Sequence, residues 1–193
     1  MTASKPVTRE DQRKSTRRRI VNAARVCFYQ HGPADVSMEQ IARATLYLHF
    51  PNRDALLMEL LSQNLTGVAR IFADLCAMKR VDLQGVRHWL QSYVDTLREH
   101  RDATRLMHVG IAATDEARTL IHGHHLALAD RLVARFPALH DETVRSRTRL
   151  MLMIGRIDDF ASAAAAKPPR IDPEAGLELV SEELMAMIAP MID

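Results

Sequence analysis

Apolar residues recur at helical spacing along almost the whole chain, and this pattern constrains the fold more than any other feature. In the first such segment, intervals of three and four residues separate Ile20, Ala23, Ala24, Cys27 and Phe28. This spacing places the side chains on one face of an α-helix. No segment shows the strict alternation of apolar and polar residues that is typical of a half-buried strand. The sequence therefore predicts an all-α fold.

Start and stop signals divide the pattern into separate helices. Gly32 and Pro33 end the first helix, predicted over about 16–31, because glycine favours the left-handed position after a helix and proline cannot continue one. Polar residues that commonly cap helix starts precede later apolar stripes: Ser37, Asn52, Asp82, Asp102 and Asp172. Further helices are predicted over about 115–136 and 141–166, the latter with Val144, Met151, Ile154, Ile157 and Phe160 facing the core.

Charge is distributed unevenly. Residues 1–19 hold seven basic and two acidic side chains, whereas the rest of the chain holds 19 basic and 22 acidic ones. A basic end on an acidic body indicates a polyanionic partner at that end, such as nucleic acid. The alternative is a solvated, disordered tail.

The cysteine content and the hydropathy pattern favour a cytoplasmic protein. Cys27 and Cys76 both lie on apolar helix faces, where a reduced, buried thiol is the usual state. No apolar run approaches the roughly 18 residues of a membrane span, and the polar N-terminus has no signal-peptide pattern.

Residues 17–61 contain an ordered series of motifs. Ile20–Ala24 is followed by Phe28 and Gly32, by the Ser37 cap with Gln40 and Ile41-Ala42, and then by Thr45-Leu46-Tyr47-Leu48-His49-Phe50 with Asn52-Arg53. In this order the motifs resemble the DNA-binding head of tetracycline-repressor (TetR) family regulators. The resemblance implies a flexible basic arm over 1–15 and a three-helix helix-turn-helix head over 16–52. A helical ligand-binding and dimerisation domain would then cover 53–193.

The resemblance also implies which residues contact DNA. Arg43 and Thr45 would begin the recognition helix and reach base edges in the major groove, and the free N–H groups after Ser37 would bind a phosphate. The remaining candidates would contact phosphates: Arg17, Arg18, Arg19, Tyr47, His49 and Arg53. For the three consecutive arginines, a solvated charge run is the alternative.

The turn of the predicted motif is missing. Only Arg43 and Ala44 separate Ala42 from Thr45, whereas a helix-turn-helix needs a turn of about three or four residues. As written, the chain from Ser37 to Phe50 could run as one continuous helix. Either several residues are absent from the sequence and the working protein has an intact motif, or the deletion is real and DNA binding is lost or altered. The first explanation is favoured because the cap and the phosphate-contact residues are retained.

The body has candidate ligand-binding residues but no identifying motif. Trp89 and Tyr93 share a helix face and could form a pocket wall, with Met107, His108 and Met151 as further contacts. Plain core packing is the alternative for each aromatic residue, and a satisfied core histidine is the alternative for His108.

Metal and enzyme chemistry are not predicted. His122, His124 and His125 lie close in sequence, but the pattern lacks the three or four convergent ligands of a zinc site. We therefore predict that these three histidines are solvated side chains on a helix. The chain has no phosphate-binding glycine loop, nucleophile elbow or H-E-x-x-H motif. We therefore predict no cofactor, no metal and no catalytic residue.

The last two helices are predicted to pair with a second copy in a two-fold, four-helix interface. The alanines from Ala163 to Ala166 permit close helix approach there. The resulting prediction is a homodimeric repressor that binds a palindromic operator and is released by a small molecule. The alternative is a helical dimer that binds a ligand or a protein and has lost DNA binding.

Overall fold

The computed structural model describes residues 8–31, 48–99, 114–139 and 144–189. These residues form helices and contain no strand: α1 Arg9–His31, α3 Arg53–Ala77, α4 Leu83–Glu99, α6 Asp115–Arg135, the short 3-10 helix η1 Pro137–Leu139, α7 Val144–Ala165 and α8 Pro173–Ile188. The all-α prediction is confirmed. The helices predicted to begin at Ser37 and Asp102 lie outside the described residues.

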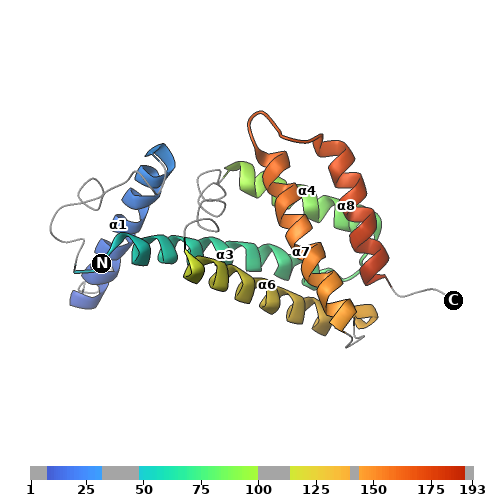
Figure 1. Ribbon diagram of the computed structural model, residues 1–193, viewed down its shortest axis with the longest axis horizontal. Helices are drawn as coiled ribbons and strands as arrows, with labels where there is room; N and C mark the ends of the chain where they lie inside the picture. Colours follow the sequence, from blue (N-terminus) through green and yellow to red (C-terminus); the bar gives the residue numbers. More distant parts are fainter. Residues whose placement is uncertain (1–7, 32–47, 100–113, 140–143, 190–193) are drawn as a thin grey trace, which may run out of the picture.

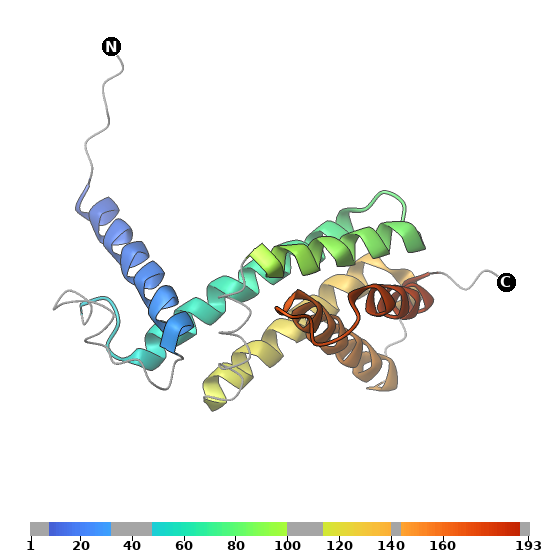
Figure 2. The same ribbon diagram turned by 90° about the horizontal axis from the view of Figure 1, so that it is seen from above.

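Helix α3 organises the molecule. At 1.5 Å per residue, its 25 residues extend about 38 Å. Helix α1 lies against one end of α3, whereas α4, α7 and α8 gather around the other end, and α6 runs beside α3 (Figures 1 and 2). None of the described helices is long and apolar enough to cross a membrane.

The predicted cap residues begin their helices as expected. The Asn52 side-chain oxygen accepts a hydrogen bond from the Ala55 N–H at 2.8 Å, and Asp82 accepts from the Gly85 N–H at 2.9 Å. Asp172 accepts from two backbone N–H groups of the first turn of α8, each at 2.9 Å. Each cap satisfies donors that lack an intrahelical partner.

Helix α1 begins earlier than predicted. Asp11 donates its backbone N–H to Thr8 Oγ1 at 3.1 Å, and its carboxylate accepts from the Thr8 N–H at 3.0 Å, which is a reciprocal capping box. The sequence prediction placed the start near residue 16 because residues 9–15 contain no apolar side chain. The prediction of a flexible arm over 1–15 is therefore wrong for residues 9–15, and residues 1–7 lie outside the described part of the chain.

Buried side chains form two apolar clusters. The head cluster joins α1, Phe50, the first turns of α3 and one residue of α6: Ile20, Val21, Ala24, Phe50, Leu56, Leu57, Leu60, Leu61 and Ala117. The body cluster lies among the second half of α3 and helices α4, α6, α7 and α8. The predicted boundary between residues 52 and 53 lies where α3 begins, whereas the packing changes from head to body within α3. Val144, predicted to face the core, is 85% exposed because it lies in the first turn of α7, away from both clusters.

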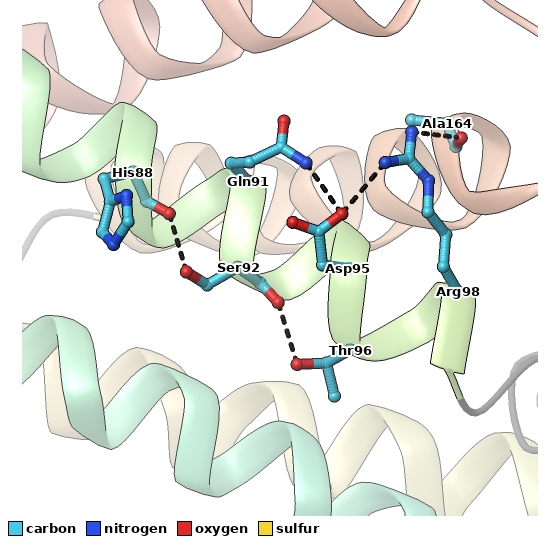
Figure 3. Close-up of polar contacts among 7 residues, drawn as sticks. All are labelled: His88, Gln91, Ser92, Asp95, Thr96, Arg98 and Ala164. Atoms are coloured by element: carbon cyan, nitrogen blue, oxygen red, sulfur yellow. Dashed lines mark hydrogen bonds and ion pairs between the residues drawn. The ribbon is translucent and has the colours of Figure 1, made fainter.

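Arginine side chains donate hydrogen bonds to backbone carbonyls at the C-terminal ends of two helices. Arg135 donates from Nε to the Cys76 carbonyl at 2.8 Å and from Nη2 to the Met78 carbonyl at 2.9 Å, closing the end of α3. Arg98 reaches from α4 to the Ala164 carbonyl near the end of α7 at 3.4 Å (Figure 3). Asp95 holds the same guanidinium at 2.9 Å. Carbonyl groups at helix ends lack intrahelical donors, and a cation there also complements the helix dipole.

Candidate nucleic-acid interface

The exposed surface of α1 is basic. Arg18 and Arg19 are both exposed, as are Arg9, Arg13 and Lys14 nearer the helix start. Lys14 forms an ion pair with Glu10 one turn earlier, with 2.7 Å between Nζ and Oε1. The other side of the helix buries Ile20 and Ala24 against α3. The helix therefore presents positive charge to solvent while its apolar stripe fixes it to the head.

Arg17, unlike Arg18 and Arg19, is paired with an acidic side chain of another helix. Its Nη1 and Nη2 lie 2.9 Å from the two carboxylate oxygens of Glu59 on α3, and its guanidinium carbon lies 4.5 Å from the centre of the Phe50 ring. The hydrogen bond from Arg17 lowers the pKa of the Glu59 carboxyl, and the same bond raises the pKa of Arg17. The charge predicted to face DNA thus pairs with an acidic side chain of the same molecule.

The end of the predicted recognition motif is a turn. Residues 48–52 are not helical, so a continuous helix from Ser37 through Phe50 is wrong for residues 48–50. Leu48 is 77% exposed and Phe50 is 2% exposed, which means that the chain here passes from the surface into the head cluster. His49 is partly buried, and its Nδ1 atom is buried without a hydrogen-bond partner.

The remaining predicted DNA contacts divide into two groups. Arg53 is partly exposed at the start of α3, with its Nε 3.6 Å from the Asp54 carboxylate. Ser37, Arg43, Thr45 and Tyr47 lie outside the described residues. The structure therefore brings Phe50, His49 and Arg53 together at the junction of the motif with α3, and it places Arg18 and Arg19 on α1.

Comparisons with known proteins show what this head is similar to. Residues 20–60 match the family described as bacterial regulatory proteins, tetR family. The match covers the motifs from Ile20 to Leu60, including the two residues between Ala42 and Thr45. The similarity to this family therefore lies in the segment that carries the predicted DNA-binding motifs.

Solved structures share the fold of this chain over nearly its whole length. Salmonella enterica GusR is 21% identical with a TM-score of 0.71, and the match covers 95% of this chain and 99% of GusR. A TetR-family transcriptional regulator from Pectobacterium atrosepticum is 20% identical with a TM-score of 0.57, covering 95% and 98% of the two chains. FadR from Bacillus halodurans, a fatty acid degradation regulator, is 14% identical with a TM-score of 0.63 and full coverage of both chains. No curated protein matches the sequence.

The aromatic residues predicted to line a ligand pocket are core residues of the body. Trp89 is 3% exposed, donates its indole N–H to the Ile71 carbonyl at 2.7 Å and meets Phe72 edge to face at 5.3 Å. Tyr93 is 2% exposed and donates its hydroxyl to Asp158 at 2.8 Å. Met151 lines a groove between α7 and α8 that neither aromatic residue lines. Met107 and His108 lie outside the described residues.

A polar network in the body was missed by the sequence prediction. The Asp158 carboxylate accepts from Tyr93 and contacts His125 Nε2 at 3.0 Å, joining α4, α6 and α7. Burial, reinforced by Asp158, raises the pKa of Tyr93 well above its usual value, so that its hydroxyl stays a donor. The adjacent His124 has a partly buried ring whose pKa is lowered by burial. His124 and His125 were predicted to be solvated, and the structure shows that both are partly buried. The sequence could not indicate the contact of His125, because its partner Asp158 is 33 residues away. No group of three or more potential metal ligands occurs within the described residues.

Proposed function

We propose that this protein is a transcriptional regulator of the TetR family, a homodimeric repressor that binds a palindromic operator and is released from it by a small molecule. The proposal of a dimer rests on the exposed outer face of α7 and α8. A dimer with two-fold symmetry in turn fits a palindromic operator. The buried polar network supports the ligand response. The exposed arginines of α1 support the contact with DNA.

The α7–α8 face is apolar and open. Leu152 on α7 is 69% exposed and Leu179 on α8 is 54% exposed. Between them lies a groove of about 740 Å³ whose walls include the small residues Ala163, Ala175 and Gly176. Large apolar side chains gathered on one exposed face mark an interaction surface. Two copies of this face, related by a two-fold axis, would form a four-helix interface.

The rim of the same face is charged. Arg156 on α7 pairs with Glu183 on α8 at 2.8 Å, and both line a second groove of about 410 Å³ beside the first. An apolar centre with a polar rim is the usual composition of a protein–protein interface. A two-fold arrangement would also place two α1 helices and two recognition segments on one DNA duplex, as a palindromic operator requires.

Coupling between the body and the head would pass through α6. Its residues His125 and Leu128 lie in the polar network and the body cluster, whereas Ala117 is buried in the head cluster. A ligand that displaced Tyr93 or His125 from Asp158 would therefore act on a helix that contacts both clusters. Such a ligand lowers operator affinity only as far as it binds the two states of the dimer differently.

The proposed DNA contacts are Arg18, Arg19, His49 and Arg53, together with Ser37, Arg43, Thr45 and Tyr47. The arginines supply attraction that does not depend on base sequence. Arg43 and Thr45 would read bases.

The shortened turn favours a second candidate function. With two residues between Ala42 and Thr45, the recognition segment could be unable to enter the major groove. The protein would then be a helical dimer that binds a small molecule or a protein and no longer represses a gene.

Two measurements on the full-length chain test the proposal. Light scattering after gel filtration should give twice the 21.8 kDa chain mass, and Leu152→Glu should give the mass of one chain. Leu83→Glu, at a leucine of α4 that is 44% exposed, is the matched control and should leave the dimer intact. Selection from random duplexes at low salt should recover an inverted repeat. A dimer that selects no DNA favours the second candidate function. A monomeric wild-type protein contradicts the dimer that both candidate functions assume.

A further inference from the structure

Arg17 lies at the point where three segments of the head meet. Its guanidinium bonds to both oxygens of Glu59 at 2.9 Å and lies over the Phe50 ring. These contacts join α1, the turn of residues 48–52 and α3. Phe50 is also the last residue of the Thr45–Phe50 motif, so its position sets where the recognition segment ends.

A second arginine extends this contact along the same two helices. Gln63, one turn after Glu59 on α3, donates from Nε2 to Glu59 Oε1 at 2.9 Å. Its own amide oxygen accepts from Arg25 Nη2 at 3.1 Å. Arg17 and Arg25 are eight residues apart and so lie on one side of α1. We name the four residues Arg17, Arg25, Glu59 and Gln63 the head clasp.

We propose that Arg17 is a positioning residue, which holds Phe50 and the end of the recognition segment in place through Glu59 and does not bind a DNA phosphate. The proposal rests on the DNA-binding function of the head. It reverses the expectation from sequence, in which Arg17 stands with Arg18 and Arg19 as one of three equivalent phosphate contacts.

Geometry distinguishes Arg17 from its two neighbours. A guanidinium that donates two parallel hydrogen bonds to one carboxylate has a fixed orientation, and lysine cannot reproduce it. To reach a phosphate, Arg17 would have to give up Glu59 and the Phe50 ring together. Arg18 and Arg19 are exposed on the same helix. The clasp therefore contributes geometry to DNA binding, whereas its neighbours contribute charge.

Conservative substitutions in the full-length chain separate these roles. Arg17→Lys keeps the charge and loses the double hydrogen bond, and Glu59→Gln keeps the size and loses the carboxylate. Arg70→Lys, at an exposed arginine of α3 outside the head clasp, is the control for binding, and Arg18→Lys is the control for hydrogen exchange. Glu10→Gln on α1 is the control for loss of an acidic charge. Binding is measured on a mixed-sequence DNA duplex over a series of salt concentrations.

We expect Arg17→Lys and Glu59→Gln each to weaken binding by about tenfold, a typical size for coupled residues in one network. The double variant should be no weaker than either single one. The slope of log affinity against log salt, which counts phosphate contacts, should not change. Arg70→Lys should stay within about twofold of the wild type, because it keeps its charge at an exposed site outside the proposed DNA contacts. If Arg17→Lys binds like the wild type and Glu59→Gln binds more tightly than Glu10→Gln, Arg17 is a phosphate contact and the proposal is wrong.

Hydrogen exchange gives a readout that needs no DNA. Backbone amides of α1 should exchange faster in Arg17→Lys and Glu59→Gln than in the wild type, and they should be unchanged in Arg18→Lys. Unchanged exchange in the first two variants contradicts the positioning role. If the wild-type chain binds no duplex even at low salt, the DNA-binding function fails, and the exchange result still decides whether the clasp holds the head.

Discussion

The head and the body of this protein are stabilised in different ways. Within the described residues, the head cluster contains nine buried apolar residues, whereas the body cluster contains 25. The body therefore gains most of its stability from burial of apolar surface. The described part of the head buries fewer apolar residues, and the head clasp adds polar contacts between α1 and α3.

This difference bears on function. A closely packed body resists gradual deformation and moves between discrete arrangements. Helix α3 belongs to both clusters, through Leu56–Leu61 at one end and Val68–Leu75 at the other. Helix α6 also contributes to both clusters, so a change in the body would reach the head through these two helices.

The largest expected effect is on the body core. Phe72→Ala removes a fully buried ring that meets both Trp89 and Tyr93 edge to face. We expect the free energy of unfolding to fall by about 3–5 kcal/mol, the usual cost of such a cavity. Urea denaturation measures this change, and Leu83→Ala, at a leucine of α4 that is 44% exposed, should shift the value by less than about 0.5 kcal/mol. A small effect of Phe72→Ala would mean that the body is not the stable part of the molecule.

The next largest expected effect on stability is at the C-terminal end of α3, where Arg135 binds two backbone carbonyls. Arg135→Met keeps the aliphatic stem but leaves the carbonyls of Cys76 and Met78 without their charged donor. We expect a loss of about 2 kcal/mol, because each carbonyl loses a charge-assisted hydrogen bond. Arg80→Met is the control, since the Arg80 side chain is 89% exposed and its nearest carboxylate oxygen lies 3.6 Å away. Equal losses in both variants would show that the end of α3 does not need its cap.

Two glycine substitutions compare the part of α3 between the clusters with helix α8 of the body. A Cβ added at Gly176 would lie 2.2 Å from the Phe160 ring, whereas one added at Gly67 would meet nothing within 4 Å. Gly176→Ala should lower the free energy of unfolding by about 1 kcal/mol or more through overpacking. Gly67→Ala, between the two clusters on α3, should raise it by about 0.5–1 kcal/mol because alanine favours the helix. Thermal denaturation of the two variants beside the wild type reveals the sign of each change. A gain in stability for Gly176→Ala would contradict the packing described for α8, and a loss for Gly67→Ala would contradict the open space beside Gly67.

Local signals predicted much of this architecture, and long-range contacts account for what they missed. Asn52 and Asp172 were predicted as caps because a cap acts within three residues of its own position. The start of α1 at Arg9 was missed because an apolar stripe marks only the part of a helix that packs. A capping box of Thr8 and Asp11 was present in the sequence as the signal that could have found it.

The site residues show the same limit more strongly. Arg17 and Glu59 are 42 residues apart, and Tyr93 and Asp158 are 65 residues apart. No periodicity or spacing links residues at such separations. Three consecutive arginines therefore look equivalent in the sequence, although the fold gives one of them a carboxylate partner on another helix.

The smallest expected effect is a dependence of head stability on pH. Arg17 lowers the pKa of Glu59 in the folded protein, so the folded state binds a proton less readily than the unfolded chain. The contribution of Glu59 to stability is therefore fully present above the ordinary glutamate pKa of about 4.3, and it is lost as the pH falls through the lower, folded value. The effect is small because the side chains of Arg17 and Glu59 are 42% and 27% exposed to solvent.

Glu59→Gln isolates this contribution from the other acidic groups. The pKa of Asp11 is also lowered, by its hydrogen bond with Thr8, so α1 as a whole loses stability in the same acidic range. Hydrogen exchange of the α1 amides, corrected for the intrinsic pH dependence of exchange, should show less protection below about pH 4 than at pH 7 in the wild type. The loss should be smaller in Glu59→Gln and unchanged in Arg18→Lys. An equal loss in all three proteins would show that Glu59 does not titrate against Arg17, and the head would then depend on its apolar cluster in the same way as the body does.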